Sequence, residues 1–178
     1  MAKVSWLHIS DIHILRRGNT RSAEAFNQEK VLDQFLNFLT NRFPENKIER
    51  PQYLFITGDL AFRGKKDDYD LKDPRKYSVR RMIDRVSVAM GIEKGEYAQR
   101  IFPVAGNHDV DRDTLTDVDI EDANLKTAKD IDKLNELFIS DEEEAHQRKE
   151  RVLTRSEPYC DFVRELWNKP KLTNDEVL

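Results

Sequence analysis

The chain has 178 residues, of which 38% are hydrophobic and 36% are charged, and its formal net charge is −4. This length suits one domain with its own core, and the periodic apolar blocks argue against intrinsic disorder. The negative charge excludes a general attraction to nucleic acid or anionic membranes, and the apolar runs are too short to span a bilayer. A lone cysteine, Cys160, and the absence of a signal-peptide pattern after Met1 predict a cytoplasmic protein.

The first half of the chain alternates strand-like and helix-like segments. Residues 4–10 form a short apolar run that ends at the polar Asp11, which predicts a strand. Ser22 is a suitable N-cap for a long helix to about residue 43, because apolar residues recur there at helical spacing. Residues 53–57 predict a second strand, which Gly58 ends.

Charge then changes sign along the chain. Residues 63–85 hold nine Lys and Arg against five Asp, a local balance of +4. A second amphipathic helix is predicted after Pro74, with this apolar face: Val79, Met82, Ile83, Val86 and Met90. Residues 101–104 predict the third strand, and residues 109–122 then hold seven carboxylates and one Arg.

The remainder, residues 113–178, has a helical pattern and little strand signal. Six of its residues are predicted to be buried: Phe138, Leu153, Phe162, Val163, Leu166 and Trp167. Cys160 is also expected in the core. The alternating order of strands and helices predicts an α/β fold with parallel strands and flanking helices.

Polar side chains follow each predicted strand. Asp11 and His13 follow the first strand, Asp59 follows the second, and Asn107 and His108 follow the third. Ligand sites of α/β sheets gather at the carboxyl ends of the strands, so these residues are expected to converge. Imidazole, carboxylate and amide ligands together suit Mn, Fe or Zn, and the sequence does not choose among these metals.

A pair of divalent ions in such a site would act on a phosphate ester. Two ions about 3.5–4 Å apart would clamp the phosphate and lower the pKa of a bridging water, giving a metal-bound hydroxide for in-line attack. His108 would stand beside the ions and protonate or stabilise the departing oxygen, and Asp109 would orient its ring.

These motifs resemble the first three motifs of calcineurin-like metallophosphoesterases, whose domain is an α/β/β/α sandwich. The matching stretches are Ser10-Asp11-Ile12-His13, Gly58-Asp59-Leu60 and Gly106-Asn107-His108-Asp109. The resemblance implies a dinuclear centre, with manganese the first choice of metal. It places Asp11 and His13 on one ion, Asp59 between the two ions and Asn107 on the second ion. It implies that His108 is the catalytic acid or stabilises the leaving group.

The later part of the family pattern is missing from the chain. The family carries further histidine ligands in a Gly-His and a Gly-His-x-His motif, whereas the only histidine after His108 is His146, in a charged helix-like run. The resemblance therefore covers residues 4–112, the first half of the domain. Three explanations stay open: an N-terminal piece of a longer protein, a split enzyme completed by another chain, or a degenerate relic.

We expect a phosphodiesterase that acts on nucleotides or nucleic acid, a preference based on the family and on the basic residues 63–85. For these residues themselves, a solvated helix face is the favoured interpretation over contact with a polyanionic substrate. The alternative function is a catalytically incomplete regulatory or assembly module. If the missing half is supplied in cis or by another chain, the surface should expose an apolar patch. His8, inside the first strand, is expected to be a buried structural histidine or one that supports a ligand residue, and not a ligand itself.

Overall fold

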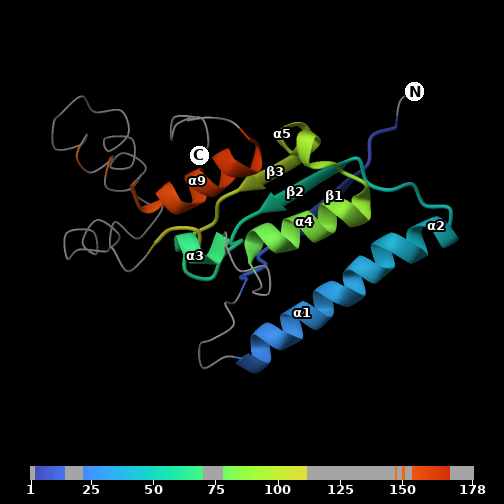
Figure 1. Ribbon diagram of the computed structural model, residues 1–178, viewed down its shortest axis with the longest axis horizontal. Helices are drawn as coiled ribbons and strands as arrows, with labels where there is room; N and C mark the ends of the chain where they lie inside the picture. Colours follow the sequence, from blue (N-terminus) through green and yellow to red (C-terminus); the bar gives the residue numbers. More distant parts are fainter. Residues whose placement is uncertain are drawn as a thin grey trace, which may run out of the picture.

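Three parallel strands form one sheet in the order β1–β2–β3 (Figure 1). They span Trp6–Ser10 (β1), Tyr53–Thr57 (β2) and Ile101–Val104 (β3). The computed structural model describes residues 3–14, 22–69, 78–111, 147, 150 and 154–168. The second and third strands have their predicted bounds, and the first begins two residues later than predicted.

The strands end level with one another. Ser10 pairs with Thr57, and Thr57 pairs with Val104, so the three carboxyl ends lie side by side. The pairing continues past the strands, because His13 N donates to Asp59 O at 2.8 Å and Gly58 N donates to Val104 O at 3.0 Å. The segments that carry the predicted ligands are therefore in contact through their backbones.

Helices connect the strands. Their bounds are Ser22–Asn37 (α1), the π-helical Phe38–Arg42, Phe43–Glu45 (α2), Lys66–Tyr69 (α3), Val79–Met90 (α4), the 3-10 helix Lys94–Glu96, Tyr97–Arg100 (α5) and Glu157–Leu166 (α9). The predicted long helix reaches its expected end, but its last part widens into a π-helix. Ser78 Oγ caps α4 by accepting from Arg81 N, and Gly91 ends it with a positive φ of 74°.

The core lies between the sheet and these helices. Leu54, Ile56 and Ile101 point from the strands into it and are fully buried. The predicted apolar face of α4 is buried, as are Cys160, Phe162, Val163 and Leu166 of α9. The half-buried Trp167 donates its indole Nε1–H to Ile101 O at 3.0 Å and fastens α9 to β3. The predictions for Phe138, Leu153 and His146 lie outside the described residues.

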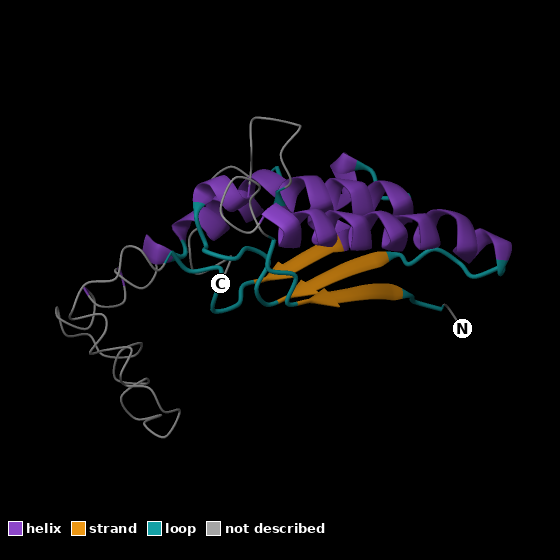
Figure 2. Cartoon of the chain, turned by 90° about the horizontal axis from the view of Figure 1, so that it is seen from below, coloured by secondary structure: helices purple, strands orange, loops and turns teal. Residues whose placement is uncertain are grey.

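In the described part of the chain, the helices lie on one face of the sheet and leave the other open (Figure 2). Large apolar side chains occupy this open face: Trp6 is 62% exposed, Val104 52% and Phe55 36%. His8 lies there too, where its Nε2 contacts Thr57 Oγ1 at 2.7 Å. The prediction that His8 is buried is wrong, because strand alternation places it on the open face.

The α/β class with parallel strands and flanking helices is confirmed. The second β layer of the expected sandwich is not among the described residues. Of the predicted helical remainder, 113–178, the structure describes 147, 150 and 154–168, where α9 lies. None of the described helices is long and apolar enough to cross a membrane.

Candidate metal centre

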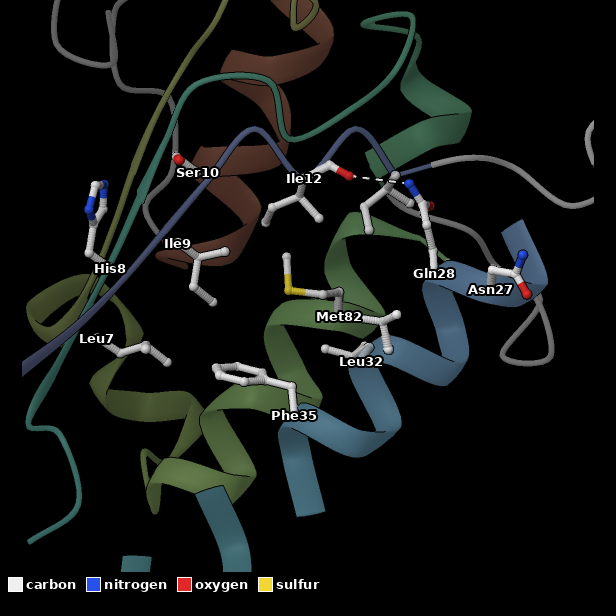
Figure 3. Close-up of a pocket in the computed structure, with 12 residues that line it drawn as sticks. Leu7, His8, Ile9, Ser10, Ile12, Asn27, Gln28, Leu32, Phe35 and Met82 are labelled. Carbon is white, nitrogen blue, oxygen red and sulfur yellow. Dashed lines mark hydrogen bonds between the residues drawn. The ribbon is translucent and has the colours of Figure 1, made fainter. Parts of the chain in front are cut away.

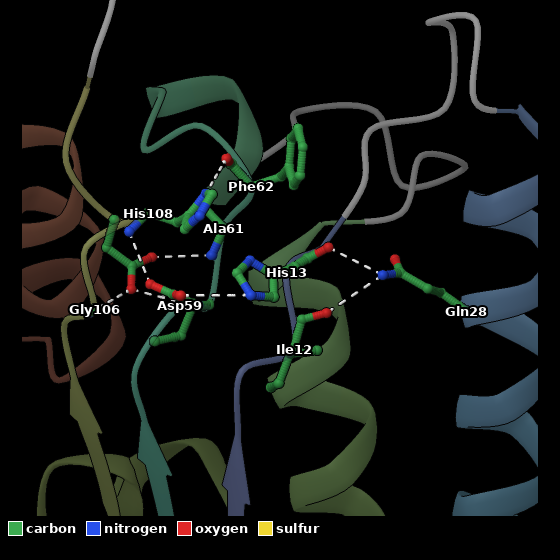
Figure 4. A network of polar contacts seen from close by, with 10 residues as sticks. Ile12, His13, Gln28, Asp59, Ala61, Phe62, Gly106 and His108 are labelled. Carbon is green, nitrogen blue, oxygen red and sulfur yellow. Dashed lines mark hydrogen bonds and ion pairs between the residues drawn. The ribbon is translucent and has the colours of Figure 1, made fainter.

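Three of the predicted residues meet at the carboxyl ends of the strands (Figure 4). His13, Asp59 and His108 each offer one ligand atom, and these atoms all lie within 4.8 Å of one another. His13 Nε2 is 3.4 Å from Asp59 Oδ2, and the rings of His13 and His108 meet edge to face with centroids 4.6 Å apart. We call these three residues the metal group.

The backbone is strained where the ligands are carried. Asp11, His13 and Asp59 have positive φ angles of 52°, 46° and 38°. Such angles are uncommon for residues other than glycine and cost free energy, so they persist only where the surroundings impose them. Among the described residues only two further non-glycine positions, Lys47 and Asn168, share this conformation. Its concentration at the predicted ligands indicates a functional constraint.

Glycine allows the loops to approach closely. A Cβ on Gly106 would lie 2.2 Å from Asp59 N, so only glycine fits there. A Cβ on Gly58 would lie 3.9 Å from Asp11 Oδ1, which places the exposed Asp11 carboxylate beside the end of β2. Asp11 is not part of the metal group. Asn107 is exposed and directly precedes His108 in the chain.

His108 is held from two sides. Its backbone N–H donates to Asp59 Oδ1 at 2.8 Å, and its Nδ1 lies 2.9 Å from Phe62 O. A carbonyl oxygen can only accept, so Nδ1 carries the hydrogen and Nε2 is left as the reactive nitrogen. The Phe62 ring also packs near both histidines, with centroids 6.4 Å from His13 and 5.7 Å from His108.

Asp109 does not orient the His108 ring, and that prediction is wrong. Its side chain is fully buried and accepts hydrogen bonds from backbone N–H groups and from the Tyr69 hydroxyl. Burial raises the pKa of the Asp109 carboxyl, and these hydrogen bonds partly offset that rise. Burial and the neighbouring Asp109 also raise the pKa of Tyr69, so its hydroxyl stays protonated and donates.

The metal group fits a divalent ion. Two imidazole nitrogens and a carboxylate oxygen are ligands typical of Mn, Fe or Zn. His13 Nδ1 is buried and has no hydrogen-bond partner within the described ranges. Buried polar atoms normally have partners, so this nitrogen is an exception. The ring nitrogen that faces Asp59 is the other one, Nε2.

A separate pocket of about 700 Å³ lies between β1 and α1 (Figure 3). Apolar side chains dominate its lining, among them Leu7, Ile9, Leu32 and Phe35, and no member of the metal group contributes. This lining does not suit a charged phosphate ester. The pocket is therefore not the substrate site of the metal group.

Arginines in the described part of the basic segment are paired. Arg80 contacts Asp84 at 3.2 Å, and Arg85 pairs with Asp33 of α1. Arg81 lies 4.0 Å from Glu29, also on α1. These arginines tie α4 to α1 or brace α4 itself, so these three side chains give little support to a nucleic-acid contact.

The sequence did not single out Phe62 and Tyr69 as part of this site. Phe62 reads as an apolar residue after a strand, and Tyr69 falls in the basic segment. Their spacing to the ligands has no recognisable motif, so only the folded arrangement reveals them.

Comparison with protein families gives one clear result. A family model described as calcineurin-like phosphoesterase matches residues 5–174, nearly the whole chain. A search of curated proteins finds no match. The match extends well beyond the three motifs that carried the sequence resemblance. The chain belongs to the calcineurin-like phosphoesterase family.

Proposed function

We propose that the chain is the N-terminal part of a metal-dependent phosphodiesterase that acts on nucleotides or nucleic acid. The observation that carries this proposal is the metal group, in which His13, Asp59 and His108 converge on one point at the strand ends. Family membership supports phosphoester hydrolysis. The nucleotide preference rests on family analogy, since the basic segment supports it little.

Each residue has a proposed role. His13 and Asp11 would hold one ion, Asp59 would be a ligand of both ions, and Asn107 would hold the second. When bound, divalent ions supply a Lewis acid for the phosphate and activate a water as the nucleophile. In this role His108 stands beside the ions and does not ligate one. When both ring nitrogens are protonated, Nδ1–H stays on Phe62 O and Nε2–H gives its proton to the departing oxygen.

Manganese is the proposed metal, with iron or zinc as alternatives. The nitrogen and oxygen donors suit all three. Calorimetric titration of the chain with each metal tests the identity and the number of ions. We expect weak binding to the isolated chain, because the later histidine motifs are missing from it. Two tightly bound Mn²⁺ per chain would contradict the idea that the site is incomplete.

Hydrolysis of bis(p-nitrophenyl) phosphate by the complete gene product, with and without Mn²⁺, tests the reaction. We expect Asp59→Ala to abolish metal-dependent turnover and His108→Ala to reduce it about 10²–10⁴-fold, the usual contribution of a general acid. His8→Ala is the matched control, since His8 is exposed on the open face and outside the metal group. Equal background rates in all the proteins would refute the enzyme.

The open sheet face favours the second candidate function, an assembly module. Parallel sheets are normally covered on both faces, and the exposed Trp6, Phe55 and Val104 leave this one uncovered in the described part of the chain. We propose that a second β-sheet covers it, supplied in cis or by another chain. The open face ends at the metal group, so a covering layer would reach the site.

The fluorescence of Trp6 measures whether the open face is covered. In a Trp167→Phe background Trp6 is the only tryptophan of the chain. Acrylamide should quench it strongly in the isolated chain and weakly in the product of the whole gene. Equal quenching in the two proteins would contradict cover in cis, and the same assay with a candidate partner would then test cover in trans. The cytoplasmic location stays a prediction.

A further inference from the structure

The Asp109 carboxylate joins the two loops that carry the metal group. Its Oδ1 accepts from Ala61 N at 2.9 Å and from the Tyr69 hydroxyl at 2.8 Å. Its Oδ2 accepts from Leu60 N at 3.1 Å and from Gly106 N at 2.9 Å. Each oxygen thus has two donors, which is how a fully buried carboxylate is tolerated.

These donors lie directly beside the ligands. Leu60 follows Asp59 in the chain, and Gly106 lies two residues before His108. The loops are in close contact at this point, because Asp59 Oδ1 accepts from His108 N at 2.8 Å. A shift of Asp109 would therefore move Asp59 relative to His108, and the spacing of metal ligands depends on such supporting contacts.

Tyr69 is the side chain that holds Asp109 from outside these loops. It comes from α3, is 1% exposed, and donates to Asp109 Oδ1. Its ring stacks on Phe162 at 5.2 Å and meets Tyr159 edge to face at 6.2 Å, both on α9. The hydroxyl is thus fixed by ring packing and aimed at the carboxylate.

We propose that Tyr69 is a positioning residue for the metal group, acting through Asp109. The proposal rests on the proposed metal site. The three other donors to Asp109 are backbone groups of the loops themselves, so the Tyr69 hydroxyl is the donor that links its carboxylate to a part of the fold outside them. Tyr69, packed on α9, thus anchors the Asp109 carboxylate. Residues of α9, remote in sequence, thereby contribute to the geometry of the strand ends.

Tyr69→Phe tests this role, because it removes the hydroxyl and keeps the ring packing. Tyr97→Phe is the matched control. Tyr97 is also 1% exposed, and its hydroxyl donates to a carboxylate, Asp84 Oδ1, at 3.1 Å. It lies on α5, before the first residue of β3, and so at the opposite end of the sheet from the metal group.

Calorimetry with Mn²⁺ and thermal unfolding measure the consequence. We expect both variants to lose similar stability, while only Tyr69→Phe weakens Mn²⁺ affinity, by about tenfold or more. Amide exchange of the metal-free protein gives a second readout. The N–H groups of Leu60, Ala61 and Gly106 should exchange faster in Tyr69→Phe and at the wild-type rate in Tyr97→Phe.

The outcomes separate the two proposals. If the wild-type chain binds no Mn²⁺, the proposed metal site fails and the role of Tyr69 fails with it. If the wild type binds Mn²⁺ but Tyr69→Phe binds it equally well, only the role of Tyr69 is overturned. Unchanged amide exchange in Tyr69→Phe, or equal losses of affinity in both variants, would also overturn it.

Discussion

The two faces of the sheet are built from alternate residues of the same strands, yet they meet different surroundings. On the helix-covered face Leu54, Ile56 and Ile101 are fully buried. On the open face Phe55 and Phe102 stack on each other with ring centroids 5.1 Å apart, and Phe55 remains 36% exposed. The covered face supplies the core of the described fold. The open face keeps apolar residues that this fold does not bury.

Apolar side chains that lie outside the core of their own fold suggest that they contact another part of the protein or a partner. Isolated exposed apolar residues are common on proteins, but a row across adjacent strands marks an interaction surface. The difference between the faces therefore distinguishes residues that form the hydrophobic core from residues that form an interaction surface. Two substitutions test this distinction, and a third extends the comparison to the strand ends, where the two faces meet the site.

The largest effect is expected at Ile56. Ile56→Ala should lower the free energy of unfolding by about 2–5 kcal/mol, because it leaves a cavity in a closely packed core. Urea unfolding measures the loss. A loss in free energy of unfolding below about 1 kcal/mol would show that the covered face packs loosely. The two faces would then not differ in packing as described.

A smaller effect is expected at its neighbour, Phe55. Phe55→Ala should cost only about 1 kcal/mol, mainly the aromatic contact with Phe102, because the ring is already part-exposed. The same urea experiment compares it directly with Ile56→Ala. A loss as large as that of Ile56→Ala would mean that the open face is covered in solution.

The smallest effect, of opposite sign, is expected at the edge where the strands end. Asp11→Gly should raise stability by up to about 1 kcal/mol, because glycine accepts the positive φ at Asp11 with less strain. Lys47→Gly is the matched control, with a φ of 57° in an exposed turn. Both should stabilise the chain, and only Asp11→Gly should weaken Mn²⁺ binding in calorimetry. Equal Mn²⁺ affinity in the two variants would contradict the role of Asp11 as a metal ligand.

Much of the fold was predictable from the sequence. The strands at 53–57 and 101–104 are short, mostly apolar runs that each follow a polar residue, Gln52 or Arg100, and local pattern suffices to find them. The strand pattern does not say which face of the sheet is covered, so His8 was predicted to be buried although it lies on the open face. The π-helical turn at 38–42 was missed because its apolar spacing resembles that of an ordinary helix.

The site was predictable as a set of residues and less so as an arrangement. Strand ends placed His13, Asp59 and His108 together, and the structure brings them together. The direction of the Asp109 carboxylate was not predictable, because it depends on Tyr69, forty residues earlier, and on backbone groups that exist only in the folded loops. Spacing identifies chemical groups, and packing decides their orientation.

The level ends of the three strands have a consequence for how the gene can change. Ser10, Thr57 and Val104 stand opposite one another, and the ligand segments begin within a few residues of them. Inserting or deleting one residue inside a strand would exchange its two faces and also shift the ligand along the sheet. Strand length is thus constrained both by the assignment of side chains to faces and by the position of the ligands. We therefore expect homologues to differ in the length of the connections between strands and helices.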